Sequence, residues 1–390
     1  MSYAGDYNNL KEHFTLKDDR VDFPGYDFTV YNLPFESDRT EFLPSDTFHD
    51  GTYPGTYCLA PDNRIEENRR FSYPVMVGQK AKNSEEAIIL LHGLNERDWS
   101  KYLPWAKALY ERTGQPVILF PISFHVNRSP ASWKDPRLMG KLAKERKRRY
   151  PGLSDVSFVN AAISERIEKM PRRFYTSGLE TFYDIVKLIR QLKNGRHPLL
   201  SGIKRVNFFG YSIGALLTEV LLMTNPGNLL KDSKAVLFCG GTTMDRMKGA
   251  SRFIIDHAAF DALKSYFFNL DKHLKNDKQL STLLKELKPG VYFKAMIDSM
   301  KLRRLRNNRL RSLESKIMLL SMYKDRVIPP ISIINTFSGY SAKVSGHIRV
   351  FDFPYSYTHE DVFPVNNPEK EKIIDQAFNK VFSQASMHLL

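Results

Sequence analysis

The sequence has little that would tie the protein to a disulfide framework or a membrane. Of its 390 residues only Cys58 and Cys239 are cysteines, and they lie far apart. We therefore expect free thiols, a reducing compartment and, by default, the cytoplasm. The first residues, 1–6, lack the basic-then-apolar pattern of a signal peptide, and no apolar run has the length needed to span a bilayer.

Metal and phosphate motifs are also missing. No group of histidine, cysteine and acidic residues has the spacing of a zinc site, and no glycine-rich loop could cradle a phosphate. The sequence therefore predicts that neither a metal nor another cofactor is needed. What the chain does have is 42% hydrophobic residues, enough for one large core with a smaller unit beside it.

The most informative segment is residues 206–215. An apolar run, 206–209, leads directly into Gly-Tyr-Ser-Ile-Gly at 210–214 and then into a helix-like sequence. A serine on a sharp turn between a strand and a helix needs small neighbours, because a side chain two residues away would collide with either element. The start of the helix would also offer N–H groups to a developing oxyanion. We interpret Ser212 as the serine of a nucleophile elbow; the alternative is a glycine-rich turn with an incidental serine.

The surrounding segments supply the alternation of strands and helices that such an elbow requires. Residues 87–95 form a buried-strand pattern that ends in His92-Gly93. Apolar residues at helical spacing follow at 99–110, and another apolar strand follows at 116–120. We expect His92 to be structural, and the whole unit to be strand, helix and strand in a sheet covered on both faces.

Two later segments contribute an acid and a histidine. An apolar strand within 316–329 ends at Asp325, and a last strand pattern within 347–361 is followed by His359 in a loop. Serine, acid and histidine thus occur in that chain order. The main rival acid is Asp245, which follows the strand pattern 235–239. Weaker rivals are Asp352, Asp361, His347 and His257.

With these segments in this order, the chain resembles the α/β-hydrolase fold from about residue 70 to its end. The resemblance implies an α/β class with a mostly parallel twisted sheet, helices on both faces and a helical cap insertion; here an irregular N-terminal extension is added. It implies that Ser212 is the nucleophile, His359 the general base and acid, and Asp325 the group that orients the imidazole. It also implies an oxyanion hole formed by the backbone N–H groups of Leu94 and Ile213. No subfamily is recognised, so no substrate follows.

The domain boundaries are predicted from the same pattern. We expect residues 1–69 to form an extension packed on the core, residues 70–242 and 313–390 the catalytic domain, and residues 243–312 a helical cap over Ser212. Residues 1–60 look loop-like but are too aromatic for disorder, and some of their rings could line an acyl pocket. Edge strands are expected at 57–60 and 70–79. A capping box of Ser177 and Glu180 predicts a helix start there.

Four residues are candidates for substrate contact. His125, Asn127 and Arg128 follow a strand expected at 117–124, on the edge where open α/β folds bind ligands, and the alternative is that they anchor the loop. Tyr211, within the glycine motif, is the fourth.

The net charge of +15 is concentrated in two runs, 141–149 and 301–311. Solvated helix faces, recruitment of an anionic substrate or lipid, and nucleic-acid binding would each explain them. Nucleic acid is not expected as a partner, since no helix-turn-helix or stacking motif accompanies the charge. Peripheral membrane contact stays open, and nothing indicates the oligomeric state.

The function expected from these features is hydrolysis of an acyl ester or thioester through an acyl-enzyme, as in a carboxylic-ester hydrolase. A serine peptidase or an acyltransferase of the same fold is the alternative. An alternative of another class is a basic protein that binds anionic ligands or nucleic acid.

Overall fold

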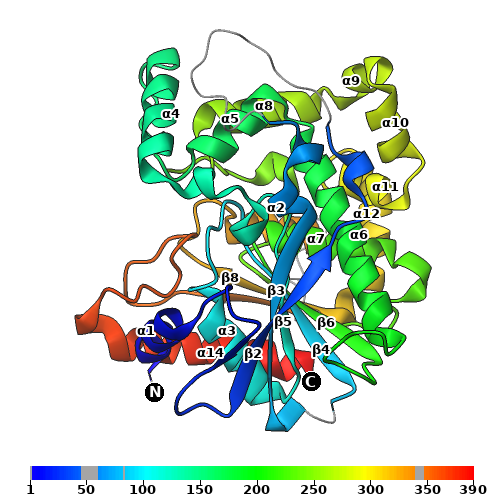
Figure 1. The fold of residues 1–390 in the computed structure, drawn as a ribbon. Coiled ribbons are helices and arrows are strands. Elements are labelled where there is room, and N and C mark those ends of the chain that lie inside the picture. The colour runs from blue at the N-terminus through cyan, green and yellow to red at the C-terminus, as the bar shows by residue number, and fades with distance from the viewer. Residues whose placement is uncertain (1, 45–59, 82–83, 339–346) are drawn as a thin grey trace.

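A computed structural model describes residues 2–44, 60–81, 84–338 and 347–390. Within these ranges, nine strands form one sheet in the order β1-β2-β3-β5-β4-β6-β7-β8-β9 (Figure 1). The strands from β5 to β9 along this order are parallel, and β1, β2 and β3 extend the sheet antiparallel. The predicted α/β class with a mostly parallel sheet is confirmed. The strands are β1 Arg20–Asp22, β2 Phe28–Glu36, β3 Arg70–Gly78, β4 Glu86–Leu91, β5 Val117–Leu119, β6 Arg205–Tyr211, β7 Ala235–Phe238, β8 Ile317–Met322 and β9 Ile348–Phe351.

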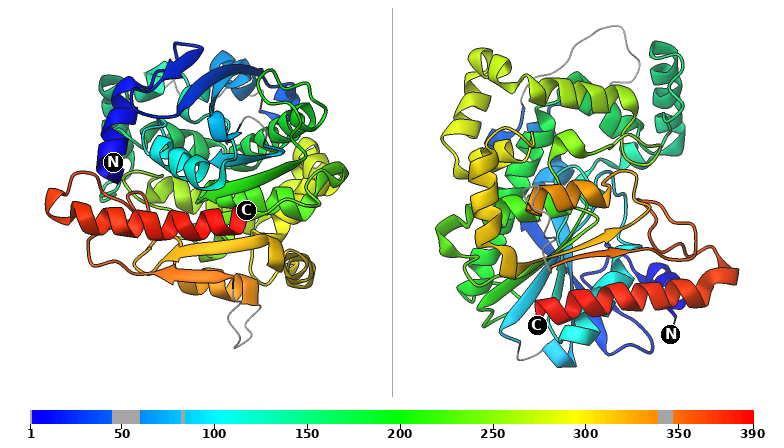
Figure 2. Two further views of the ribbon diagram at one scale, coloured as in Figure 1. Left: turned by 90° about the horizontal axis from the view of Figure 1, so that it is seen from below. Right: turned by 180° about the vertical axis from the view of Figure 1, so that it is seen from behind.

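Helices cover both faces of the sheet, which is why its central strands are apolar throughout. Along β4, Ile89 and Leu91 belong to one buried cluster, whereas Ile88 and Leu90 belong to another. The first cluster includes side chains of α6 (Arg173–Lys193) and α7 (Ile213–Thr224). The second includes α1 (Tyr3–His13), α3 (Tyr102–Thr113) and α14 (Glu371–Leu389), which pack together on the opposite face (Figure 2).

The prediction that residues 1–60 are loop-like was wrong for much of the described part. α1 and the strands β1 and β2 occupy it, and β2 pairs with β3 along its whole length. In β2, Phe28, Val30 and Asn32 are buried at alternate positions, because each face of a strand receives every second side chain. Phe35 is buried on the opposite face. The strand expected at 70–79 is confirmed as β3. Of the strand expected at 57–60, all but residue 60 lies outside the described residues, as do Phe48 and Cys58.

The predicted capping box was also wrong. Helix α6 begins at Arg173 rather than at Ser177, and the Ser177 hydroxyl donates to the Arg173 carbonyl oxygen at 2.6 Å. A serine inside a helix can satisfy its hydroxyl in this way without capping anything. The apolar stripe that was predicted to follow it is buried as expected: Leu179, Phe182, Val186 and Ile189.

A layer of helices lies beyond the carboxyl ends of the parallel strands (Figure 1). It contains α4 (Pro136–Arg149) and α5 (Ala161–Lys169) as well as α8 (His257–Phe268), α9 (Leu270–Asn276) and α10 (Lys278–Lys285). Buried Arg146 joins the two groups, since its guanidinium donates to Asp256 at 2.7 Å and to Glu165 at 2.5 Å. The layer is therefore built from two segments of the chain, 136–169 and 257–285, and not only from residues 243–312. The predicted boundaries of the cap stay a prediction.

Four further helices complete the chain as described. They are α2 (Glu66–Arg69), α11 (Lys288–Ala295), α12 (Arg303–Ser312) and α13 (Pro330–Ser338), of which α11 packs against both α7 and α12. Among the helices that the structure describes, none combines the length and apolar character needed to cross a membrane.

Candidate active site

Ser212 occupies a strained turn between β6 and α7. Its backbone has φ 55° and ψ −114°, a conformation that costs a non-glycine residue of order 1–3 kcal/mol. The glycines on either side have no room for a side chain. A Cβ on Gly210 would lie 2.7 Å from the Gly214 carbonyl oxygen, and a Cβ on Gly214 would lie 2.4 Å from the Leu91 carbonyl oxygen. The two glycines thus allow β4, β6 and α7 to approach closely enough to hold this turn.

Gly214→Ala is accordingly expected to destabilise the fold by about 1–3 kcal/mol, because the added methyl group must push α7 away from β4. Denaturant unfolding measures the effect. Gly140, inside α4, is the matched control, since a Cβ there meets nothing within 4 Å. Gly140→Ala is expected to stabilise by about 0.4–1 kcal/mol. Equal stability of Gly214→Ala and the wild type would contradict the close approach described here.

Three residues predicted from the sequence meet above this turn. Nε2 of His359 lies 2.8 Å from Oγ of Ser212, and Nδ1 of His359 lies 2.7 Å from Oδ2 of Asp325. All three side chains are buried, with Ser212 the most exposed at 9%. With a carboxylate beside Nδ1, the proton of the neutral imidazole belongs on Nδ1, and the Nε2 lone pair accepts from the serine hydroxyl.

The loops after β8 and β9 bring the acid and the histidine to Ser212. Oδ1 of Asp325 accepts the backbone N–H groups of Val327 at 2.9 Å and Ile328 at 2.8 Å. These two bonds leave Oδ2 free for His359. The Asp325 carboxylate is therefore fixed by its own loop in the orientation that the imidazole requires.

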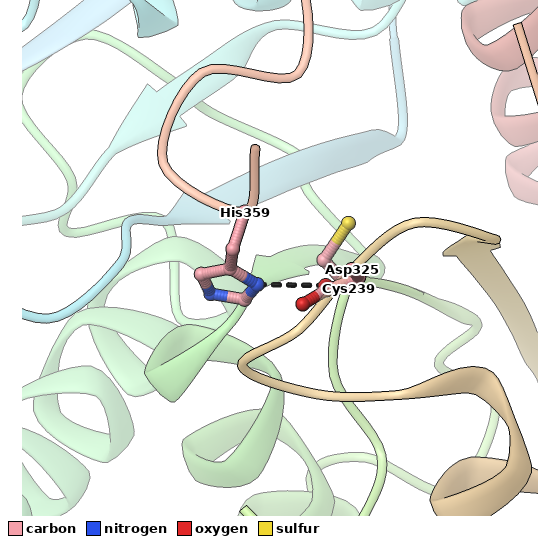
Figure 3. Close-up of side chains that lie close together, drawn as sticks. All are labelled: Cys239, Asp325 and His359. Atoms are coloured by element: carbon pink, nitrogen blue, oxygen red, sulfur yellow. Dashed lines mark hydrogen bonds and ion pairs between the residues drawn. The ribbon is translucent and has the colours of Figure 1, made fainter. Parts of the chain in front are cut away.

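Cys239 is a neighbour of this group that sequence reasoning missed (Figure 3). It follows β7 with φ 48°, and one polar atom from each of Cys239, Asp325 and His359 lies within 4.8 Å of the others. Burial raises the pKa of the Cys239 thiol well above its usual value, and the Asp325 carboxylate, to which the thiol hydrogen-bonds, raises it further. The thiol therefore stays protonated and donates to the acid. Because β7 and β8 are parallel neighbours, their shared carboxyl edge was a signal that could have placed Cys239 beside Asp325.

The same three residues are a group that could hold a metal ion in the described part of the chain. However, both ring nitrogens of His359 already have hydrogen-bond partners. A metal would have to displace Asp325 or Ser212 from the imidazole, so the donor set does not fit a resident ion.

Tyr211 packs directly against His359. Its hydroxyl donates to the His359 carbonyl oxygen, and the two rings stack with centroids 5.5 Å apart. Only 2% of Tyr211 is exposed. The Tyr211 ring thus supports His359, and contact of Tyr211 with substrate stays a prediction.

The three residues after β5 that were predicted to contact substrate have different surroundings in the structure. Arg128 has no exposed surface and forms ion pairs with Asp184 at 3.0 Å and Glu180 at 3.4 Å. The Asn127 amide donates to the Ser72 carbonyl oxygen at 2.8 Å. For these two residues the contacts are those of the loop-anchoring alternative, and their contact with substrate stays a prediction. His125 differs, since it lines a pocket beside Ser212.

The rival acids and histidines have other partners. Asp245 accepts from the Ser299 hydroxyl at 2.6 Å, and His257 pairs with Asp155 at 2.7 Å. His347 precedes β9, at the opposite end from His359. His92 is structural, as predicted: its Nε2 accepts the Ile122 N–H at 2.9 Å, and its Nδ1 donates to the Gly93 carbonyl oxygen. Asp352 bonds Lys324 and Tyr357 on the surface.

Two hollows of different character adjoin the site. Leu94 and Ile213, the predicted oxyanion-hole residues, line a narrow apolar pocket of about 60 Å³ that is partly open to solvent. No described aromatic residue from positions 1–60 lines it. Asp325 and His359 instead line a wider, open groove of about 1210 Å³, whose walls include Lys248, Lys324 and Lys370.

The basic runs are only partly solvated. Lys141, Lys144 and Lys147 are exposed on α4, as a solvated helix face would be. Arg146 and Arg306, by contrast, are buried. Arg306 donates to backbone carbonyl oxygens, among them that of Ala295 at 2.7 Å, so part of the excess charge serves the fold.

The chain belongs to the family whose model matches its whole length. The model described as Family of unknown function (DUF6051) matches residues 1–390. No curated protein matches the sequence.

Solved structures that resemble the chain include three esterases, all with little sequence identity. A variant of the esterase rPPE has 9% identity and a TM-score of 0.49, with 100% of this chain and 88% of that chain covered. Carboxyl esterase 2 of the mycorrhizal fungus Tuber melanosporum has 10% identity and a TM-score of 0.45, with 100% of this chain and 98% of that chain covered. A cold-adapted esterase from an Arctic intertidal metagenomic library has 11% identity and a TM-score of 0.41, with 92% of this chain and 95% of that chain covered.

Proposed function

We propose that the protein is a serine hydrolase that cleaves an acyl ester or thioester through an acyl-enzyme on Ser212. The observation that carries this proposal is the imidazole of His359, hydrogen-bonded on one side to Oγ of Ser212 and on the other to Asp325. A serine hydroxyl alone is a poor nucleophile, and an adjacent base that is itself oriented by an acid is the arrangement that activates it.

In the first half of the reaction, Oγ of Ser212 attacks the carbonyl carbon of the substrate while Nε2 of His359 takes the hydroxyl proton. The carbonyl oxygen becomes an oxyanion, which we assign to the backbone N–H groups of Leu94 and Ile213. The bond to the leaving group then breaks, and His359 returns the proton to the departing alcohol or thiol.

In the second half, water attacks the acyl group on Ser212 and gives its proton to His359. The bond between Oγ and the acyl carbon breaks, Oγ recovers the proton, and a carboxylic acid leaves. Asp325 holds the imidazole in the required tautomer and stabilises the imidazolium during both halves.

A fluorophosphonate probe tests the proposal without knowledge of the substrate, because it reacts only with an activated serine. One adduct per chain is expected by intact mass, and peptide mapping is expected to place it on Ser212. Heat-denatured protein is the control and should stay unlabelled, since the hydrogen bonds to His359 are then lost. Absence of an adduct on the folded wild type would overturn the assignment and favour a basic protein that binds anionic ligands.

A further inference from the structure

Residues 300–305 combine exposed apolar side chains with exposed cations. Their sequence is Met-Lys-Leu-Arg-Arg-Leu, and they lead from the turn before α12 into the first residues of that helix. The apolar side chains have these exposed fractions: 66% for Met300, 44% for Leu302 and 36% for Leu305. Lys301 and Arg304 are exposed between them. Single exposed apolar residues are common on protein surfaces, but three within six residues form a patch.

The backbone that carries this patch is fixed by buried and bonded groups. Arg306 is buried, and its guanidinium donates to four backbone carbonyl oxygens between positions 295 and 301, at 2.5 to 3.4 Å. Oδ1 of Asp298 accepts the backbone N–H of Met300 at 2.8 Å. Leu302 has φ 50°, a left-handed conformation that disfavours a residue with a Cβ. The fold thus holds Met300 and Leu302 in solvent at fixed positions.

The helices around this turn are strongly basic. Residues 257–316 contain 14 lysines and arginines but only six aspartates and glutamates, so they carry a net charge of +8 out of the +15 of the whole chain. α9 lies beside the turn, since Nζ of Lys301 is 3.9 Å from Oδ2 of Asp271, and α9, α10, α11 and α12 pack in succession along one side of the molecule (Figure 1). Five lysines of α9, α10 and α11 are exposed: Lys272, Lys275, Lys278, Lys285 and Lys288. Their combined field attracts anionic surfaces.

We infer that residues 300–305 and the basic helices around them bind a membrane surface that contains anionic lipids. Apolar side chains that project from a cationic surface fit the boundary between acyl chains and headgroups, because the apolar groups leave water while the cations stay near the lipid phosphates. A nucleic acid would match the charge but would leave the apolar side chains in water, which is why a lipid surface is favoured. The inference is independent of the proposed function, since vesicle binding needs neither Ser212 nor a substrate.

The experiment measures co-sedimentation of the full chain with vesicles of phosphatidylcholine alone and of phosphatidylcholine mixed with phosphatidylserine. The wild type is expected to partition at least about tenfold more strongly onto the anionic vesicles, and less strongly as salt is added. Lys301→Glu combined with Arg304→Glu is expected to lower partitioning onto anionic vesicles on the order of a hundredfold, because two attractions become repulsions. Met300→Ser combined with Leu302→Ser is expected to lower it about tenfold or more, because two apolar side chains no longer leave water.

Each variant has a matched control elsewhere on the surface. Lys141→Glu combined with Lys144→Glu changes the net charge equally but on α4, and Met387→Ser removes an equally exposed methionine from α14. Both controls should bind anionic vesicles within a few-fold of the wild type.

Thermal denaturation checks that each variant is folded. If the apolar double variant fails to fold, the charge-reversed variant and the salt dependence still decide the question. Equal binding to both kinds of vesicle, or binding to neither, would overturn the inference, and binding of duplex DNA without binding of anionic vesicles would assign the charge to nucleic acid instead. Wild-type binding by the charge-reversed variant would also overturn it, because another surface would then hold the membrane.

Discussion

Ser212→Ala is expected to lower kcat for ester hydrolysis on the order of 10⁵ to 10⁶-fold, the largest effect expected of any substitution in this chain. The reason is that Oγ of Ser212 forms the covalent bond to the acyl group, and no other hydroxyl group is known to bond Nε2 of His359 in the described residues. Residual turnover would come only from groups that bind the substrate and its oxyanion. The measurement is kcat for the best p-nitrophenyl ester.

Stability provides the necessary comparison, because a misfolded variant would also be inactive. The free energy of unfolding of Ser212→Ala is expected to stay within about 1 kcal/mol of the wild type, since the side chain makes one hydrogen bond. Ser321→Ala is the control: Ser321 is a fully buried serine in the neighbouring strand β8 and should be dispensable for turnover. Retained activity in Ser212→Ala would remove it as the nucleophile.

Much of the central fold was predictable because parallel strands covered on both faces have to be continuously apolar. The predicted strand patterns within 87–95, 206–209, 235–239 and 316–329 each coincide with part or all of one strand of the sheet. The turn at Ser212 could also be predicted from the sequence, because its geometry requires glycine at positions 210 and 214. Asp325 and His359 followed from chain order, since the carboxyl ends of parallel strands share one edge.

The N-terminal strands and the start of α6 were less predictable, for two physical reasons. The pairing of β2 with β3 depends on a partner about forty residues away in the chain, which no local turn signal reports. Ser177 has the spacing of a cap, but its hydroxyl bonds within the helix instead. The local sequence allowed residues 28–36 to be a loop or a strand, and Ser177 to begin a helix or lie inside one. Tertiary packing decided between these possibilities.

Contacts between side chains from distant segments were the least predictable part of the site. Arg128 looked like a ligand-binding cation because it follows a strand end, yet two acids of α6 surround it. The position of Cys239 beside Asp325 depends on the register between β7 and β8. Sequence gives the edge of the sheet on which a residue lies, but not the direction of its side chain.

Asp325→Asn is expected to lower kcat by about 10⁴-fold with little change in the fold. The asparagine carbonyl oxygen can still accept the N–H groups of Val327 and Ile328, so the loop stays in place. Its amide would then face His359 and donate to Nδ1. That donation moves the ring proton to Nε2, which can no longer accept the proton of Ser212. The rate of fluorophosphonate labelling should fall together with kcat.

Asp245→Asn tests whether Asp245, rather than Asp325, is the acid that orients His359. Asp245 also follows a strand of the sheet, but it accepts a hydrogen bond from Ser299 and is not bonded to His359. Its variant should therefore keep kcat and the labelling rate within a few-fold of the wild type. If Asp245→Asn lost activity while Asp325→Asn kept it, the acid would have to come from the loop after β7, and the imidazole would have to turn away from Asp325 during catalysis. Because Asp325 is held by its own backbone on one oxygen and by His359 on the other, we expect the opposite result.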